Sequence, residues 1–236
     1  MQYERQQKIL EIIGEKKTAT VAELAALVFA SEASVRRDVA CLEQKGYVRR
    51  VYGGVVLSNY KNSVVPLDLR DGDNSSAKEL IAKRAAELVF DGATVLMDAS
   101  STVRRMIKYL DGKKDLRIIT NNQRIFGEAD GIDAEIYCTG GIYSKKNHAF
   151  LGSAAESFVR AVHADLVFFS SQALSDDGEI SDVSEQETAL RRVMLEHADR
   201  KVFLCDSSKL GQRKTFTLCR REDVDLIICD RELPSE

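Results

Sequence analysis

The fold of the N-terminal part is decided by the stretch SEASVRRDVACLEQK, residues 31–45. Drawn as a helix with 100° between successive residues, this stretch collects apolar side chains on one side: Val35, Val39 and Leu42. Arg37 points to the opposite side, and Arg36 lies on the flank. Ser31 is a suitable N-cap, and Gly46 is a suitable stop. The pattern predicts a helix that packs through its apolar side and carries two arginines on its surface.

Two shorter helical patterns precede this helix, and a β-rich segment follows it. An apolar stripe over residues 9–13 stops near Gly14, and residues 21–28 repeat apolar side chains at the i, i+3, i+4, i+7 spacing of a core-facing helix. Residues 47–56, YVRRVYGGVV, predict two short strands around a glycine pair. Three helices followed by a basic hairpin predict a winged helix-turn-helix over residues 1–57.

The outward side of the third helix suits the major groove of DNA. An arginine bonds the edge of a guanine bidentately, a serine reaches a phosphate or a base, and arginines of the wing meet the phosphate backbone or the minor groove. DNA contacts are therefore expected from five side chains: Ser34, Arg36, Arg37, Arg49 and Arg50. Two alternatives stay open, namely a solvated helix face on which Arg36 pairs with Glu32, and a winged helix that binds protein instead of DNA.

Composition limits the class of protein. With 236 residues, 44% of them hydrophobic and 30% charged, the chain is neither disordered nor membrane-embedded. No apolar run approaches the ~20 residues of a spanning helix and the first residues do not resemble a secretory signal, which indicates a cytoplasmic protein with no membrane partner. The net charge of −3 argues against a protein that coats nucleic acid by bulk charge. That charge is unevenly divided, however, with a net +2 over residues 1–57 and −5 over the remainder.

Cysteine and histidine spacing predicts neither a metal site nor a cofactor. The five cysteines are widely separated and never form C-x-x-C, and the three histidines show no metal-ligand spacing. Buried free thiols in a reducing compartment are the expected state of these cysteines.

A polar, turn-rich segment separates the first domain from a second one. Its composition predicts a linker over residues 58–74 and a second domain over residues 75–236. Beyond the linker, helical patterns such as those over residues 103–110 and 185–197 alternate with short apolar runs at residues 93–97, 116–119, 134–137, 165–169, 201–205 and 226–229. This alternation is typical of an α/β domain with a largely parallel sheet.

The residues that follow these apolar runs are candidates for ligand binding, because ligands of parallel sheets bind outside the carboxyl ends of the strands. They are small, hydroxylated or charged: Asp98, Ser100, Ser101, Thr102, Thr120, Asn121, Gly140, Gly141, Asp206 and Lys209. Helix N-termini and hydroxyls bind phosphate, glycines let a ligand approach the backbone, and Asp206 and Lys209 add a carboxylate and an ammonium. A small, hydroxyl-rich, anionic ligand is expected. Taken singly, each group is also explained as a helix cap, a turn or a solvated pair.

Several of these segments resemble the DeoR family of bacterial transcriptional regulators. The resemblance rests on residues 4–10, on SEASVRRDV (31–39) and on RVYGG (50–54), and it extends over about 95% of the chain. Val39 and Tyr52 replace the leucine and histidine of the family's pattern.

The second domain resembles the sugar-phosphate sensing domain of the same family, which shares its fold with ribose-5-phosphate isomerase and coenzyme A transferases. The family's Lys-x-x-Ile-Ala corresponds to residues 78–82, which adds Lys78 to the predicted phosphate site. Its phosphate loop corresponds to residues 98–102, without the usual glycine. Residues 168–173, FFSSQA, replace a common Gly-Ala-x-Gly run, so the pocket is expected to differ there.

The resemblance implies a homo-oligomeric regulator that binds a double-stranded DNA operator and responds to a phosphorylated sugar, with repression the commoner sense in the family. In such a protein, Lys78, residues 100–102 and Lys209 receive the phosphate. Asp98 and Asp206 bind sugar hydroxyls or orient Lys209. The alternative is a sugar-phosphate isomerase with an appended winged helix, in which Asp98, Asp206 and Lys209 supply acid–base chemistry. The module that resembles a DNA reader favours the regulator over the enzyme.

Overall fold

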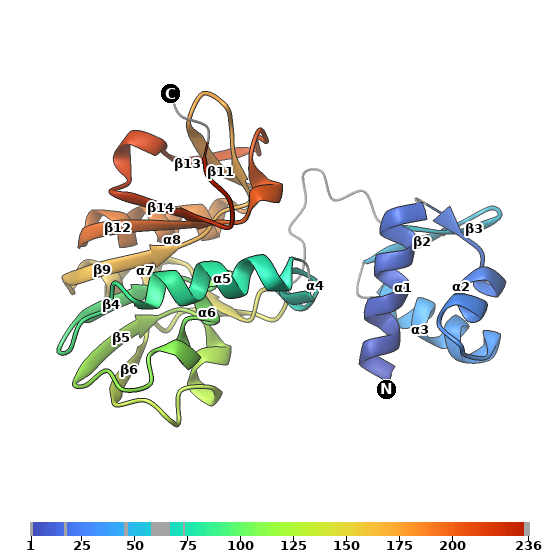
Figure 1. Ribbon diagram of the computed structural model, residues 1–236, viewed down its shortest axis with the longest axis horizontal. Helices are drawn as coiled ribbons and strands as arrows, with labels where there is room; N and C mark the ends of the chain where they lie inside the picture. Colours follow the sequence, from blue (N-terminus) through green and yellow to red (C-terminus); the bar gives the residue numbers. More distant parts are fainter. Residues whose placement is uncertain (1, 17, 45–46, 58–66, 73, 234–236) are drawn as a thin grey trace. The chain divides into compact units, whose positions relative to one another are not determined.

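The computed structural model describes residues 2–16, 18–44, 47–57, 67–72 and 74–233. The chain divides into two compact units, residues 1–65 and 66–236 (Figure 1). Much of the linker expected at 58–74, residues 58–66 and 73, lies outside the described residues. In the remainder of that range, Leu67–Gly72 forms the short helix α4.

The first unit is a three-helix unit with a small sheet. Its helices are α1 (Gln2–Lys16), α2 (Val21–Leu27) and α3 (Glu32–Gln44). Its strands are β1 (Thr18–Ala19), β2 (Val48–Val51) and β3 (Gly54–Leu57), in the order β1-β3-β2. The helices and the β2–β3 hairpin confirm the predicted winged helix-turn-helix. The two-residue strand β1, which pairs with β3, was not expected from the sequence.

Local sequence explains where these helices begin. Thr20 and Glu23 form a capping box at the start of α2, with a 3.1 Å bond from the Glu23 amide to the Thr20 hydroxyl. The amide of Ser34 donates to the Ser31 hydroxyl at 3.3 Å, as an N-cap does. The predicted apolar side of α3 is confirmed, since its three side chains are at most 1% exposed: Val35, Val39 and Leu42.

The second unit is built on a six-stranded parallel sheet in the order β14-β12-β9-β4-β5-β6. All six apolar runs singled out in the sequence are strands of this sheet, which confirms the α/β prediction. Their bounds are β4 (Thr94–Met97), β5 (Leu116–Thr120), β6 (Ala134–Cys138), β9 (Ala164–Phe169), β12 (Ala198–Cys205) and β14 (Leu226–Cys229).

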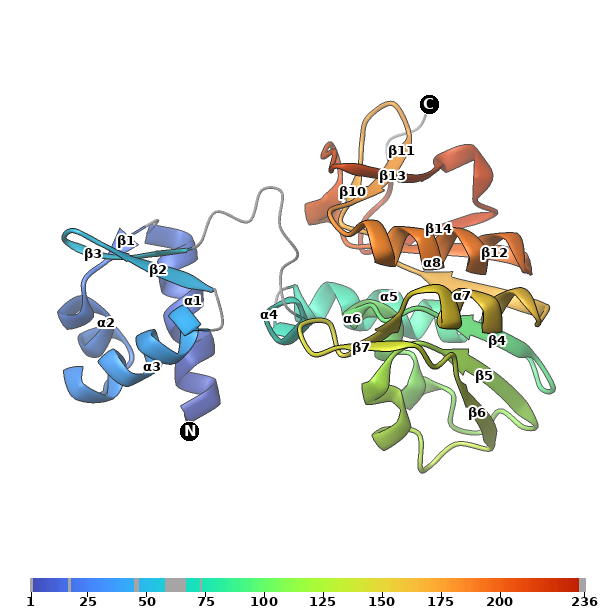
Figure 2. The same cartoon turned by 180° about the vertical axis from the view of Figure 1, so that it is seen from behind.

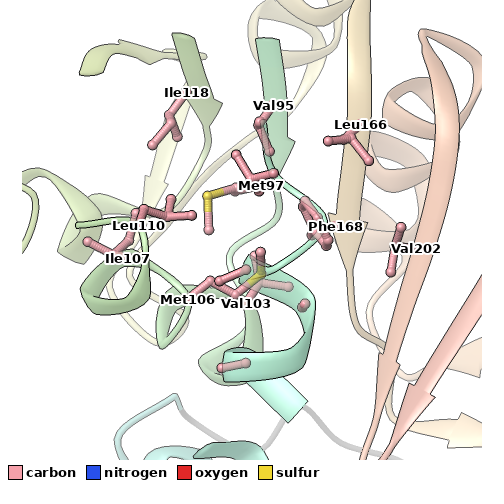
Figure 3. Packing of buried hydrophobic residues seen from close by; sticks show 14 of the residues in the cluster. Val95, Met97, Val103, Met106, Ile107, Leu110, Ile118, Leu166, Phe168 and Val202 are labelled. Atoms are coloured by element: carbon pink, nitrogen blue, oxygen red, sulfur yellow. The ribbon is translucent and has the colours of Figure 1, made fainter. Parts of the chain in front are cut away.

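Helices cover both faces of the sheet (Figures 1 and 2). One face carries α5 (Ser75–Ala86) and α6 (Ser101–Arg104), and the other carries α7 (Ser153–Arg160) and α8 (Glu185–Glu196). Successive strand residues alternate between the two cores, so that Val95 and Met97 pack under α6 while Leu96 packs on the α8 side (Figure 3). The helix expected over residues 103–110 is wrong in extent, because α6 ends at Arg104 and a separate 3₁₀ turn, η1, spans Ile107–Tyr109.

Smaller elements surround the sheet. Two strands, β7 (Ile142–Ser144) and β8 (Ala149–Leu151), form a hairpin, and three more, β10 (Ala173–Leu174), β11 (Glu179–Asp182) and β13 (Phe216–Arg220), form an antiparallel sheet. Further 3₁₀ turns are η2 (Gln123–Gly127), η3 (Ser207–Lys209) and η4 (Arg221–Asp223). Among the described residues, no helix is both long and apolar enough to cross a bilayer.

Candidate functional site

The exposed side of α3 carries the arginines singled out in the sequence. Arg36 and Arg37 are exposed and Ser34 is half-buried. The guanidinium of Arg36 lies 2.7 Å from the Glu32 carboxylate, so the ion pair of the solvated-face alternative is present. The Arg36 and Glu32 side chains are 67% and 48% exposed, and such a pair contributes only about 0.3–0.5 kcal/mol. Arg36 is therefore easily released to a phosphate or a base.

The wing presents the other two arginines. Arg49 and Arg50 are exposed on β2, and the Arg50 guanidinium lies 3.1 Å from the carboxylate of Glu43 near the end of α3. The backbone N–H of Arg50 donates to the same carboxylate at 3.0 Å, which fixes the wing relative to α3. At the tip, Tyr52 is fully exposed and precedes Gly53, whose φ of 89° lies in the left-handed region.

One buried carboxylate holds α3 on α1. Asp38 has no exposed surface, and it accepts hydrogen bonds from Arg5 Nε at 2.5 Å and from Gln6 Nε2 at 3.1 Å. Asp38 was not among the residues predicted from the sequence. The available signal was its position three residues after Val35, which puts a charged side chain on the apolar side of the helix. A charge there needs a partner from another element.

In the second unit, the structure brings the predicted strand-end residues to one edge of the sheet. Residues 98–102 follow β4, Thr120 and Asn121 end β5, residues 140–141 follow β6, and residues 206–209 follow β12. These four strands are parallel, so their carboxyl ends share an edge. Hydrogen bonds decide which of these residues actually meet.

Asp206 and Lys209 meet through an ion pair. The Lys209 ammonium lies 3.4 Å from the Asp206 carboxylate and donates to the Ser170 hydroxyl at 2.8 Å. Asn74 at the start of α5 donates to Asp206 at 3.0 Å. Burial alone would raise the pKa of Asp206, but the Lys209 charge, a hydrogen bond from Ser208 and the charge of Lys78 together hold it below its usual value. Asp206 is therefore a carboxylate that pairs with Lys209.

Asp98 does not pair with Lys209, one of the two roles expected for it. Its carboxylate accepts from Arg191 Nε at 2.7 Å and from the Ser170 amide at 3.2 Å. Arg191 also bonds Asp182 at 2.9 Å and lies 3.8 Å from Glu187, and all four side chains are at most 4% exposed. Arg191 was not among the residues predicted from the sequence, although its place on α8 beside buried apolar residues predicts a buried charge.

The buried cluster of Arg191, Asp98, Asp182 and Glu187 holds three acids around one base. Burial alone would lower the pKa of Arg191, but the neighbouring carboxylates raise it, so the guanidinium stays charged. Burial raises the pKa of Glu187 above its usual value. Both of its carboxyl oxygens lack a hydrogen-bond partner among the described residues. With Asn121 it lines a narrow space between α8 and the ends of β4 and β5 that is too small to hold a water molecule.

Lys78 and Ser101 converge on one acceptor. The Lys78 ammonium, only 3% exposed, and the Ser101 hydroxyl both donate to the backbone carbonyl of Arg70 in α4, Ser101 at 3.4 Å. The Ser100 hydroxyl caps α6 by accepting from the Val103 amide at 3.1 Å. Two oxygens of the predicted site are buried without a hydrogen-bond partner in the described part of the chain: Thr102 Oγ1 and Asn121 Oδ1.

The other predicted residues shape the backbone. The Thr120 hydroxyl donates to the Met97 carbonyl at 2.7 Å and so ties β5 to the end of β4. Gly140 and Gly141 have φ values of 66° and 105°, and a Cβ at Gly141 would lie 2.5 Å from the Leu151 carbonyl oxygen. Within the described chain, neither glycine is hydrogen-bonded to Lys78, Ser101 or Lys209.

A winged helix-turn-helix followed by a parallel α/β unit with polar strand ends defines a DNA-binding regulator of transcription. Comparison with family models identifies it further: a DeoR-like helix-turn-helix domain matches residues 5–61, and a DeoR C-terminal sensor domain matches residues 73–231. The chain belongs to the DeoR family of transcriptional regulators. The isomerase alternative is disfavoured because related proteins are named as regulators of transcription.

Relatives match nearly the whole chain. The HTH-type transcriptional regulator GolR of Listeria innocua is 31% identical over 98% of this chain and 91% of its own length. The L-fucose operon activator of Haemophilus influenzae is 31% identical over 98% of this chain and 92% of its own. Among solved structures, ribose 5-phosphate isomerase A of Methanocaldococcus jannaschii covers 58% of this chain and 55% of its own at 17% identity and a TM-score of 0.42.

Proposed function

We propose that this protein is a repressor of a carbohydrate operon whose affinity for a double-stranded DNA operator is changed by a phosphorylated sugar. The observation that carries the proposal is the division of α3 into two sides. One side is fully buried against its own unit, and the other exposes Arg36 and Arg37 beside a basic wing. Such a helix enters the major groove with its exposed side chains at the base edges.

The proposed contacts distribute specificity and affinity between helix and wing. Ser34, Arg36 and Arg37 read the groove, where each bidentate contact contributes about 1–3 kcal/mol of discrimination. Arg49 and Arg50 bind phosphates, which positions α3 without reading sequence. The net charge of residues 1–57 is only +2, so the placement of these arginines matters more than total charge. A homodimer or a homotetramer would present paired DNA-binding units to a symmetric operator.

The proposed effector binds at the carboxyl edge of the parallel sheet. Lys78, the hydroxyls of residues 100–102 and Lys209 receive its phosphate. Asp98 and Asp206 bind hydroxyls of the sugar. The site is completed by the remaining predicted residues: Thr120, Asn121, Gly140 and Gly141. The buried, unpartnered oxygens of Thr102 and Asn121 support this assignment, because buried polar atoms ordinarily have partners.

Selection of genomic fragments by the full chain tests the proposal. Affinity for the selected fragments is then measured at fixed salt, with and without a panel of sugar phosphates. Arg36→Ala combined with Arg37→Ala should weaken specific binding by at least about tenfold, roughly 1.4 kcal/mol. Arg160→Ala is the control, since Arg160 is an exposed arginine of α7 that pairs with Glu156. No selective enrichment of DNA would refute the proposal, and selective DNA with no response to any sugar phosphate would refute its effector part.

The sign of regulation and the assembly need separate measurements. Repression requires that transcription from a promoter next to the selected operator rise when the gene for this protein is deleted. Sedimentation of the full chain should show a dimer or a tetramer, and a monomer at micromolar concentration would contradict the assembly.

A further inference from the structure

Helix α4 is the first described element after residues 58–66, which follow the DNA-binding unit. It is only six residues long, too short to be stable by itself, so its contacts with the second unit hold it in place. Leu67 is fully buried, and its amide donates to the Lys146 carbonyl at 3.1 Å. The Arg70 guanidinium lies 3.5 Å from the amide oxygen of Asn147. Within the described part of the chain, the other hydrogen bonds and ion pairs of α4 go to the predicted phosphate site or to cations beside it.

The backbone carbonyl of Arg70 accepts hydrogen bonds from two donors of the predicted phosphate site. It accepts from the buried ammonium of Lys78 and from the hydroxyl of Ser101. An ammonium and a hydroxyl that converge on one oxygen form the arrangement that also binds an oxygen of a phosphate group. A neutral carbonyl is the weaker acceptor of the two, since hydrogen bonds between ions are roughly twice as strong.

The carboxylate of Asp71 forms ion pairs with neighbouring arginines. One of its oxygens lies 3.0 Å from Arg104 at the end of α6 and 2.6 Å from Arg124 in η2. Its backbone carbonyl accepts from the guanidinium of Arg105. Two guanidinium groups, one from the end of α6 and one from η2, therefore share one carboxylate. The first also pairs with Glu128, and the guanidinium of Arg105 pairs with Glu79. A phosphate monoester carries more negative charge and three acceptor oxygens at neutral pH.

Several donors around α4 are left without an acceptor. The Nε donors of Arg70, Arg104 and Arg105 are buried and have no hydrogen-bond partner among the described residues. The carboxylate oxygen Oδ1 of Asp71, an acceptor, is likewise buried without a partner there. A buried polar group without a hydrogen-bond partner destabilises the structure. The docked position of α4 thus satisfies the cations only in part, and a group with more acceptor oxygens would satisfy them better.

We propose that α4 is a displaceable strap across the effector site, so that phosphate binding and the docking of α4 compete for the same cations. This inference rests on the proposed phosphorylated effector. Release of α4 would add its six residues to the connection that follows the DNA-binding unit. The effector would thereby change how tightly the DNA-binding unit is tethered to the sheet, and operator affinity would change with it.

Amide hydrogen exchange of the full chain, with inorganic phosphate as the probe, tests the competition. Phosphate should slow exchange at residues 101–104 and at the same concentrations accelerate exchange at residues 67–72. A phosphate that merely adds charge to a fixed site would slow exchange at both segments. Slower or unchanged exchange at residues 67–72, together with protection at residues 101–104, would support the effector site but refute the proposal that α4 is displaced.

Asp71→Asn provides the second arm, because it removes the charge that docks α4 and keeps the size of the side chain. Residues 67–72 should exchange faster in this variant without phosphate, and phosphate should bind on the order of tenfold more tightly, because the competing state is less populated. Asp111→Asn is the matched control, since Asp111 is an exposed aspartate of the same unit. Binding by the variant alone would also support the strap. Failure of phosphate to bind either protein would refute the effector site and the strap together.

Discussion

The buried pair between Arg5 and Asp38 leads to a prediction about the stability of the first, DNA-binding unit. Asp38→Asn keeps the shape of the side chain but removes its charge and turns one of its two acceptor atoms into a donor. Arg5 and Gln6 both donate to Asp38, so at least one of these bonds must be lost. Because Asp38 has no exposed surface, water does not replace the lost bond at that end.

The magnitude follows from the geometry. A hydrogen bond to a charged group contributes about 1.5–3 kcal/mol, and Arg5 is 26% exposed, so water recovers part of its loss. We expect the first unit to lose about 2 kcal/mol of its free energy of unfolding. A unit of this size has a total stability of only about 3–10 kcal/mol, so the loss is a large fraction.

Hydrogen exchange on the full chain measures this loss at the helix concerned. Amides in residues 32–44 should exchange about 30-fold faster in Asp38→Asn, which is 2 kcal/mol at the usual tenfold per 1.4 kcal/mol. Amides of β4 and β9 in the second unit should be unaffected. Glu32→Gln is the matched control, because it removes an exposed partner of Arg36 on the same helix. It should change exchange by about twofold, as surface pairs do.

Exchange in residues 32–44 that rises no more in Asp38→Asn than in Glu32→Gln would refute the reasoning. It would mean that the buried pair stabilises the first unit no better than a surface pair. The apolar contacts of Val35, Val39 and Leu42 would then hold α3 by themselves.

Three further outcomes are expected. Gly141→Ala should destabilise the second unit by about 1–3 kcal/mol in thermal unfolding, because its φ of 105° and a Cβ 2.5 Å from a carbonyl oxygen both oppose a side chain. Gly127→Ala has open space and should be near neutral, so equal losses would contradict the argument. Glu187 has a raised pKa, so its stabilising contribution is present below its unfolded pKa and is lost as pH rises through the folded value. As pH rises from about 5 to about 8, the free energy of unfolding should therefore fall less in Glu187→Gln than in the unaltered protein. Equal falls in the two proteins, measured by thermal unfolding, would count against a buried, protonated acid. Arg49→Ala should weaken binding to all DNA sequences alike and lower the slope of log affinity against log salt by about 1, whereas a sequence-dependent loss would assign Arg49 to base reading.

Much of the fold was predictable because it depends on local pattern. The spacing of apolar residues in α3 predicted its buried side, and the six apolar runs predicted the strands of the parallel sheet. The helix over 103–110 was wrong in extent, since apolar periodicity does not distinguish an α-helix from a short helix followed by a 3₁₀ turn. Helix α4 was not predicted, because its residues lie in a segment whose composition is typical of a linker. Its contacts with the second unit hold it in place.

The candidate site was predictable as a set of positions and not as a set of contacts. Strand ends could be located, since each polar group follows an apolar run. The partners of those groups come from distant parts of the chain, such as Arg191 for Asp98 and the Arg70 carbonyl for Lys78. No local sequence pattern predicts such partners, because the order of the strands in the sheet decides which distant side chains come close together.

The sequence by itself determined which residues face a core, where the strands end, and that a basic winged helix precedes an acidic α/β unit. The tertiary structure decided which strand ends meet. Strand β9 lies between β4 and β12, so Ser170 at its end stands between Asp98 and Lys209 and bonds both. Asp98 consequently pairs with Arg191 from α8, while Lys209 pairs with Asp206. Periodicity along a chain encodes the faces of its elements, but the order of strands in a sheet is set by long-range packing, and that order selects the partners.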